Sequence, residues 1–271
     1  MKKFTLLLLL FCITFLSCEE VVVVDTGTME PKLVIEASIN WIKGSTGKYQ
    51  IITLSTTTDY YNKKVPPVSG AVVFVTAVNG ERFDFFEDEA ISGNYLCDDF
   101  VPVINQSYTL TVVYKEETFT ATETLLPAPD LLYTTQENGG IFGDGKIVKA
   151  FFIDPPNDEN FYMHQFSRAG KLSQVAVFDD SYVNGNETFT VRLFDELDKG
   201  DVLNIDLMGI SERYYNYMNK IIVTVSDENV GPFQVAPAQL RGNIINRTND
   251  DNYAFGYFRL SEVSQIEHTA E

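Results

Sequence analysis

Leu33-Val34-Ile35-Glu36-Ala37-Ser38-Ile39-Asn40 is the stretch that decides the fold class. Every second residue from Leu33 is apolar, whereas Glu36, Ser38 and Asn40 between them are polar. Alternation with a period of two residues is the pattern of a half-buried β-strand, because successive side chains point to opposite faces of a sheet. We therefore expect β-structure from residue 32 onward.

The rest of the first half repeats this pattern in short segments. Turn signals separate them, and Asn79-Gly80 between two apolar runs is typical of a β-hairpin. The further strand candidates are Tyr49–Ser55, Val72–Val78, Arg82–Phe86, Ser107–Tyr114 and Thr118–Thr124. Six or seven short strands in roughly 100 residues predict an immunoglobulin-like or transthyretin-like β-sandwich over residues 32–126.

Leu126-Pro127-Ala128-Pro129-Asp130 is interpreted as a joint between two domains. Two prolines in three residues interrupt strand pairing and stiffen the chain, so we place a linker at 127–130. A second β-rich domain is then expected over 131–271. Its strand candidates are Ile147–Asp154, Asn160–Phe166, Lys171–Phe178, Glu187–Phe194, Val202–Met208 and Tyr253–Leu260.

One segment of the second half has a helical pattern instead. From Ser211 to Val225 apolar residues recur at helical spacing, Ser211 is a suitable N-cap, and Glu212 suits the first turn. Residues 230–246 are predicted to be an extended loop, and loops of that length are often functional. The polar tail after Ser261 is expected to fray.

The N-terminus has the pattern of a lipoprotein signal. Lys2 and Lys3 precede an apolar run over residues 4–16 that is shorter than the roughly 20 residues of a membrane-spanning helix. Ser17 and Cys18 then provide a cleavage and lipidation site, so 1–17 is predicted to be a signal peptide and 18–31 a lipidated tether. A plain secretory signal with an incidental cysteine is the alternative. Glu19-Glu20 is similar to a surface-export tag of Gram-negative lipoproteins; two solvated charges in a flexible tether are the alternative.

Composition excludes some classes of partner. The 271-residue chain has a formal net charge of −18, which repels nucleic acid and anionic lipid headgroups. After cleavage and lipidation Cys97 is the one remaining cysteine, so no intramolecular disulfide is expected. Its place in an alternating stretch predicts a buried, inert thiol.

Several motifs suggest chemistry but have a simpler interpretation. Gly140 to Lys146 has P-loop spacing, yet Ile147 stands where the Mg²⁺-binding hydroxyl is needed and a strand follows, so a hairpin turn is favoured. His164 is expected to be a hydrogen-bonded strand residue rather than a catalytic base, and His268 lies in the polar tail. No cofactor is predicted. The acidic turns leave a loop calcium open, with solvated turns as the alternative.

Exposed aromatic residues are the better functional signal, because they often mark contact surfaces for proteins or sugars. Together with the long loop, they give a candidate contact surface. Its members are Tyr60, Tyr61, Phe233, Arg241, Asn243 and Tyr257.

Several short segments, in this order, carry a family resemblance. They include the lipobox ending in Cys18-Glu19-Glu20, Lys32-Leu33-Val34-Ile35-Glu36, Val68-Ser69-Gly70-Ala71-Val72-Val73, Gly231-Pro232-Phe233 and Arg241-Gly242-Asn243-Ile244. Together they resemble a family of bacterial lipoproteins known as domain of unknown function (DUF) 4249. The resemblance implies a first domain like the carboxypeptidase-regulatory type of β-sandwich and genes beside TonB-dependent outer-membrane transporters. It implies no catalytic residues.

These observations predict a mainly β, two-domain lipoprotein that is anchored in the outer membrane through Cys18 and faces the cell surface. Its predicted function is that of a non-enzymatic binding or accessory subunit of a TonB-dependent nutrient transporter, with a small nutrient, peptide or glycan as the unidentified ligand. A surface adhesion or envelope-structural lipoprotein is the alternative. A hydrolase without a visible site is a third hypothesis.

Overall fold

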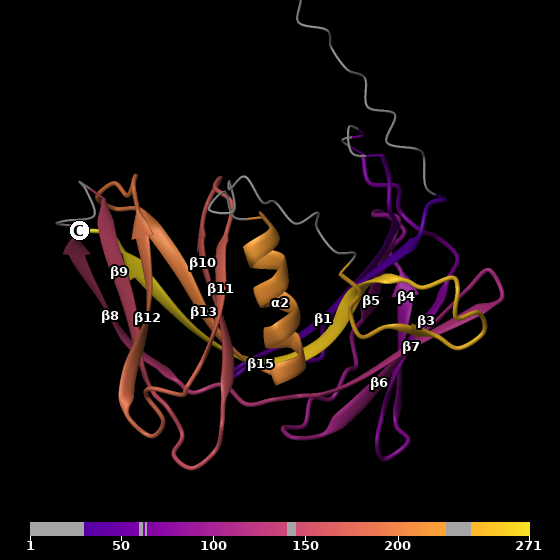
Figure 1. The fold of residues 1–271 in the computed structure, drawn as a ribbon, viewed down its shortest axis with the longest axis horizontal. Coiled ribbons are helices and arrows are strands. Elements are labelled where there is room, and N and C mark those ends of the chain that lie inside the picture. Colours follow the sequence, from indigo (N-terminus) through magenta and orange to yellow (C-terminus); the bar gives the residue numbers. More distant parts are fainter. Residues whose placement is uncertain (1–29, 60–61, 63, 140–144, 226–239) are drawn as a thin grey trace, which may run out of the picture. The chain divides into compact units, whose positions relative to one another are not determined.

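Strands make up most of the structure, a computed structural model that describes residues 30–59, 62, 64–139, 145–225 and 240–271. Figure 1 shows them with one helix, α2 (Glu212–Val225), among the described residues. The strands are β1 (Leu33–Ile42), β2 (Gln50–Thr56), β3 (Val72–Ala77), β4 (Arg82–Glu87), β5 (Asn94–Cys97), β6 (Ser107–Tyr114), β7 (Glu117–Thr124), β8 (Leu131–Asn138), β9 (Lys146–Ile153), β10 (Phe161–Arg168), β11 (Gln174–Asp179), β12 (Glu187–Phe194), β13 (Val202–Ile210), β14 (Ile245–Asn246) and β15 (Phe255–Thr269).

Twelve of these strands are hydrogen-bonded in one order, β11-β10-β13-β15-β1-β2-β5-β4-β3-β6-β7-β14, and the order β12-β9-β8 forms a second, three-stranded sheet. The long strand β15 lies between β13 and β1 in the first order (Figure 1). Its first part pairs in parallel with β1, from Val34↔Phe255 to Ile42↔Val263. Its second part pairs antiparallel with β13.

The strands of the first half enclose one apolar core, as the alternation predicts. β4 pairs with β3 through residues 82–85 and with β5 through residues 86–87, so it connects two layers. Ile35 of β1 and Ile52 of β2 pack in the same cluster as Val75 of β3 and Leu110 of β6, and all four are fully buried. This arrangement confirms the predicted sandwich.

A second layered core lies around β10. Phe166 packs with Val148 and Ala150 of β9, whereas Met163 packs with Tyr214 of α2. Because side chains alternate along a strand, β10 contributes one face to the three-stranded sheet and the other to the helix. The mainly β fold with one helix is therefore confirmed for the described residues.

The helix begins as its sequence predicts. The backbone N–H of Tyr214 donates a hydrogen bond of 3.2 Å to Oγ of Ser211, which is the N-cap interaction. Glu212 lies in the first turn, where a negative charge favours the helix dipole. No helix within the described ranges is both apolar and long enough to span a bilayer.

Most predicted strands are present with shifted ends, but β5, β8 and β14 were not predicted. β8 (Leu131–Asn138) has no strict alternation, and its side chains are mostly half-buried or exposed. It pairs antiparallel with β9, from Leu131↔Phe152 to Asn138↔Lys146, so β8 and β9 form a hairpin. Residues 140–144, where a turn was favoured over a phosphate-binding loop, lie outside the described residues. Gly139 N donates to the carbonyl O of Gly145 at 2.7 Å.

The expectation that the tail after Ser261 frays is wrong, because these residues form the second part of β15. Ser261, Ser264 and His268 are buried despite their polarity. Their polar atoms have partners: Oγ of Ser264 accepts a 2.8 Å hydrogen bond from the backbone N–H of Leu131. Nδ1 of His268 lies 2.9 Å from Oγ1 of Thr134.

The predicted linker packs closely against a strand. A Cβ built on Gly209 of β13 would lie 1.9 Å from the carbonyl O of Pro127, and the backbone N–H of Ala128 donates to Oε2 of Glu262 at 3.0 Å. Residues 31–271 form one compact unit. The division at 127–130 stays a prediction, and any boundary there leaves β15 shared between the two halves.

Candidate functional site

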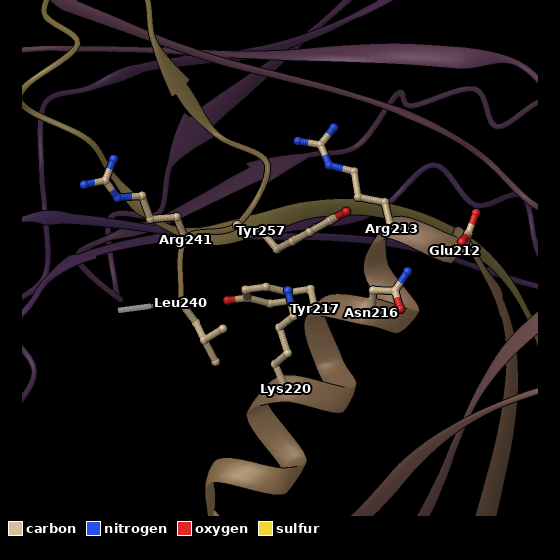
Figure 2. Close-up of a pocket in the computed structure, with 9 residues that line it drawn as sticks. Glu212, Arg213, Asn216, Tyr217, Lys220, Leu240, Arg241 and Tyr257 are labelled. Carbon is tan, nitrogen blue, oxygen red and sulfur yellow. The ribbon is translucent and has the colours of Figure 1, made fainter. Parts of the chain in front are cut away.

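A pocket of about 410 Å³ lies between helix α2 and the chain that enters β15. Figure 2 shows side chains of the helix on one side, Leu240 and Arg241 on the other, and Tyr257 between them. The lining residues are Glu212, Arg213, Asn216, Tyr217, Lys220, Leu240, Arg241, Gly242 and Tyr257. Pockets of roughly 300–1,000 Å³ are the usual size of small-molecule sites.

Tyrosine rings form the inner wall of this pocket. The ring of Tyr257 lies 4.8 Å from the ring of Tyr214 and 4.9 Å from that of Tyr217. The hydroxyl of Tyr257 donates a 2.9 Å hydrogen bond to Oε1 of Glu123. Burial, followed by the charge of Glu123, raises the pKa of Tyr257, so this hydroxyl stays protonated and holds its ring in place.

Two glycines bring the opposite wall close. A Cβ on Gly242 would lie 1.8 Å from the carbonyl O of Gly256, and a Cβ on Gly256 would lie 2.0 Å from the carbonyl O of Ile35. Gly256 also has a φ of 94°, a conformation that favours glycine. The segment from Leu240 to Gly242 therefore lies directly against β15.

Three cations surround the pocket. Arg213 and Lys220 come from the same face of α2, and Arg241 comes from the opposite wall. The guanidinium of Arg241 lies 3.6 Å from the ring centroid of Tyr253, a cation–π contact that orients it. The positive charge of Arg213 reaches the hydroxyl of Tyr257, whose pKa it lowers against the larger effect of burial.

A separate apolar surface lies on the first sandwich. Ile51 of β2 pairs with Leu96 of β5, and Leu96 pairs with Phe86 of β4, so these three side chains form a row across neighbouring strands. They are 52%, 37% and 73% exposed, and Tyr49 beside them is 70% exposed. We call Tyr49, Ile51, Phe86 and Leu96 the apolar row; they line a depression of about 470 Å³. A contiguous exposed apolar patch marks an interaction surface, unlike single exposed apolar residues.

The residues of the predicted contact surface have different positions. Arg241 and Tyr257 lie together at the pocket, although Tyr257 is only 6% exposed. Asn243 is buried, because its side chain exchanges two hydrogen bonds with the backbone of Phe258, so its role is structural. Residues 245–246 of the predicted loop form β14, which pairs with β7. The other predicted contact and lipidation residues, Cys18, Tyr60, Tyr61 and Phe233, lie outside the described residues.

The helical residues of the pocket were not predicted. Arg213, Tyr217 and Lys220 are spaced at i, i+4 and i+7, which places them on one face of a helix. The same spacing rule was applied only to the apolar residues that form the core. A search for a polar face on α2 would have found these three.

The thiol and imidazole groups are buried within the sandwiches. Cys97 is 3% exposed, so its predicted burial is confirmed, and this burial raises the pKa of its thiol to about 12. The inertness of the thiol stays a prediction. His164 is 5% exposed, and burial together with the charge of Arg192 lowers its pKa to about 3. Neither ring nitrogen of His164 has a hydrogen-bond partner in the described part of the chain, so the expected hydrogen bond is wrong.

Acidic residues do not gather into a metal site among the described residues: no group of three His, Cys, Asp or Glu side chains there is arranged to hold an ion. Asp154 and Asp180 are buried, but protein groups take up their oxygens. Asp154 accepts from the Tyr162 hydroxyl at 2.7 Å, and Asp180 accepts from the backbone N–H of Asn160 at 2.9 Å. The loop calcium stays a prediction.

Solved structures with a similar arrangement have low sequence identity to this chain. A DUF4785 family protein from Legionella pneumophila has 10% identity and a TM-score of 0.27, covering 65% of this chain and 52% of its own, so the chain spans about half the length of that protein. A cytokine receptor complex has 9% identity and a TM-score of 0.26, with 68% and 87% covered. The FN1–FN3 domains of chicken CNTN1 have 13% identity and a TM-score of 0.22, with 67% and 60% covered. At these scores the similarities say nothing about function.

No curated protein matches this sequence. A family model does, over residues 19–267 and therefore over most of the chain. The chain belongs to the family described as "Domain of unknown function (DUF4249)".

Proposed function

We propose that this protein is an outer-membrane lipoprotein that serves as a non-enzymatic binding and accessory subunit of a TonB-dependent nutrient transporter. The signal-like N-terminus that ends at Cys18 supports the lipid anchor. The acidic pair Glu19-Glu20 supports display on the cell surface. The gene neighbourhood implied by the family resemblance supports a transporter as the partner.

The apolar row is the observation that carries the accessory role. Outward-facing positions of a sandwich strand are usually polar, because one face is buried and the other meets water. Here Ile51, Leu96 and Phe86 face outward on three adjacent strands. A stable protein partner would bury this row, and aromatic residues such as Phe86 are enriched at the centre of such interfaces.

The test is recovery of the transporter with the tagged, full-length protein from membranes in mild detergent, quantified by mass spectrometry. The wild-type protein is expected to recover a TonB-dependent transporter in near-equal amount. The double variant Phe86→Asp with Leu96→Asp is expected to lose it, because two carboxylates would be buried in an apolar interface.

A matched control is available on the same molecule. Leu172 and Tyr182 are 95% and 98% exposed and lie on the β10–β11 and β11–β12 connections, away from the row. The double variant Tyr182→Asp with Leu172→Asp makes the same chemical change and should keep the transporter. Equal recovery of the transporter with both double variants would show that the apolar row is not part of the interface. A wild-type protein recovered without any transporter would contradict the accessory role and favour the adhesion hypothesis.

A further inference from the structure

The charged residues that line the pocket beside α2 are mainly basic, although the protein as a whole is acidic. The whole protein has 38 acidic and 20 basic residues, yet the lining contains three cations, Arg213, Lys220 and Arg241, and one carboxylate, Glu212. Two further carboxylates lie near the tyrosines: Glu123 accepts the Tyr257 hydroxyl, and Glu36 acts on Tyr217. Cations therefore outnumber carboxylates three to one among the residues that line the pocket, and a positively charged lining attracts anions.

The three cations at this pocket have hydrogen-bond donors that no acceptor of the described residues occupies. A guanidinium carries five donors and an ammonium three. Within the described ranges, no hydrogen bond or ion pair joins Arg213, Lys220 or Arg241 to an acceptor, whereas Lys43, Lys149 and Arg168 are paired with carboxylates. Arg241 is held by its contact with Tyr253, so its guanidinium is oriented without its donors being used.

The wall of the pocket is aromatic and rigid. Tyr257 is fixed by its hydrogen bond to Glu123 and by contacts with the rings of Tyr214 and Tyr217. The side chain of Tyr217 is half-buried and lines the pocket. A tyrosine face of this kind packs against a sugar ring or another flat apolar surface, while the surrounding cations hold a charged group.

We propose that this pocket binds a small organic anion: a body of monosaccharide size that packs against Tyr217 and carries a phosphate or carboxylate held by Arg213, Lys220 and Arg241. Arginine binds such groups through two parallel hydrogen bonds, and the lysine adds a point charge. No bond is made or broken in this role. The inference extends the proposed nutrient-capture role to a ligand class, and its biological meaning rests on that role, but it uses a surface other than the apolar row.

Matched probes test the charge requirement directly. The full-length protein in a non-ionic detergent is titrated with glucose, glucose 6-phosphate and glucuronate, and binding is followed by saturation-transfer NMR of the sugar protons. The two anions are expected to bind and glucose is not. A preference for glucose 6-phosphate identifies phosphate as the recognised group, and a preference for glucuronate identifies carboxylate. Equal signals from glucose and the anions would overturn the proposal, as would tighter binding of the cation spermidine.

Charge-reversal variants locate the binding. Arg213→Glu and Lys220→Glu each replace an exposed side chain on α2, so the fold is expected to persist, which circular dichroism checks. Each should weaken binding of the anionic probes roughly tenfold, the effect of losing one charge-assisted hydrogen bond. Lys199→Glu, in the turn before β13, makes the same charge change elsewhere and should leave binding unchanged.

Other outcomes of this series separate the two proposals. Unchanged binding by both α2 variants, or an equal loss with Lys199→Glu, would overturn the pocket as the site. Those results would leave transporter recovery through the apolar row unaffected. Conversely, anion binding that persists when no transporter is recovered would support the ligand class while contradicting the accessory role.

Discussion

The hydroxyl of Tyr162 donates a 2.7 Å hydrogen bond to Oδ1 of Asp154, and this carboxylate is fully buried. The backbone N–H of Gly185 donates to its other oxygen at 3.1 Å. A buried carboxylate is costly unless hydrogen bonds replace its water. These two hydrogen bonds therefore hold Asp154, the residue directly after β9, against β10 and against the connection that precedes β12.

The variant Tyr162→Phe removes one of these donors and leaves Asp154 with an unsatisfied oxygen. We expect the free energy of unfolding to fall by about 1–3 kcal/mol, measured by urea denaturation. Tyr133→Phe serves as the control, because its hydroxyl bonds Glu187 at 3.0 Å on the exposed surface. A Tyr162→Phe protein as stable as this control would show that Asp154 does not depend on the tyrosine.

Gly256 offers a second test, at the start of β15. Gly256→Ala would place a Cβ 2.0 Å from the carbonyl O of Ile35, in addition to the strain of its φ of 94°. Gly170→Ala has a similar φ of 73° but nothing within 4 Å of the Cβ. Both variants should lose about 1 kcal/mol from backbone strain, and Gly256→Ala should lose clearly more in thermal melts because β15 must move away from β1. Equal melting temperatures would contradict this contact.

His164 makes stability depend on pH. Its pKa is lowered from 6.5 to about 3 in the folded protein, so the unfolded chain binds a proton more readily as the pH falls below 6.5. The stabilisation from neutral His164 is complete above pH 6.5 and is lost progressively toward pH 3. Between pH 8 and pH 5 we expect a loss of about 2 kcal/mol, from 1.5 pH units at 1.36 kcal/mol each.

The variant His164→Phe isolates this contribution. Its denaturation midpoint should change less than that of the wild type over the same pH range, because the titrating imidazole is gone and the ring contacts with Phe166 and Phe178 are kept. Parallel pH profiles for the two proteins would mean that His164 is protonated equally in the folded and unfolded states.

The anchor is tested at Cys18. Cys18→Ala removes the acylated side chain, and each buried CH₂ of an acyl chain contributes about 0.8 kcal/mol to membrane binding. The variant is expected in the soluble fraction after cell fractionation, with a melting temperature unchanged from that of the wild type. Retention in the membrane fraction would contradict lipid anchoring.

Strands with strict alternation could be predicted from the sequence, because burial of one face leaves a clear period of two. β1 and β6 are examples. The end of β15 could not, since Ser264 and His268 are polar and become buried only through partners on β8 that lie more than 130 residues away. Long-range hydrogen bonds of this kind leave no local pattern.

Only part of the candidate site could be predicted from the sequence, because the pocket also depends on long-range packing. Arg241 and Tyr257 were identified from the composition of their segments, and both line the pocket. Arg213 and Lys220 lie on a polar face of α2 that the sequence could show, but only the packing of the helix tyrosines on β10, β11 and β15 shows that this face lines a pocket. Asn243 was assigned to the surface because it lies in the predicted loop at 230–246, but it is buried and makes two hydrogen bonds to the backbone of Phe258.

The parallel pairing of β1 with β15 also determines when the chain can finish folding. β1 lies next to β15 in the sheet order, and the partner of Val34 is Phe255, more than 200 residues later. Loop closure over such a separation is slow, and topologies dominated by distant contacts fold late. The β1–β15 pair therefore forms only after residues 255–263 have been synthesised, and until then β1 keeps one edge open.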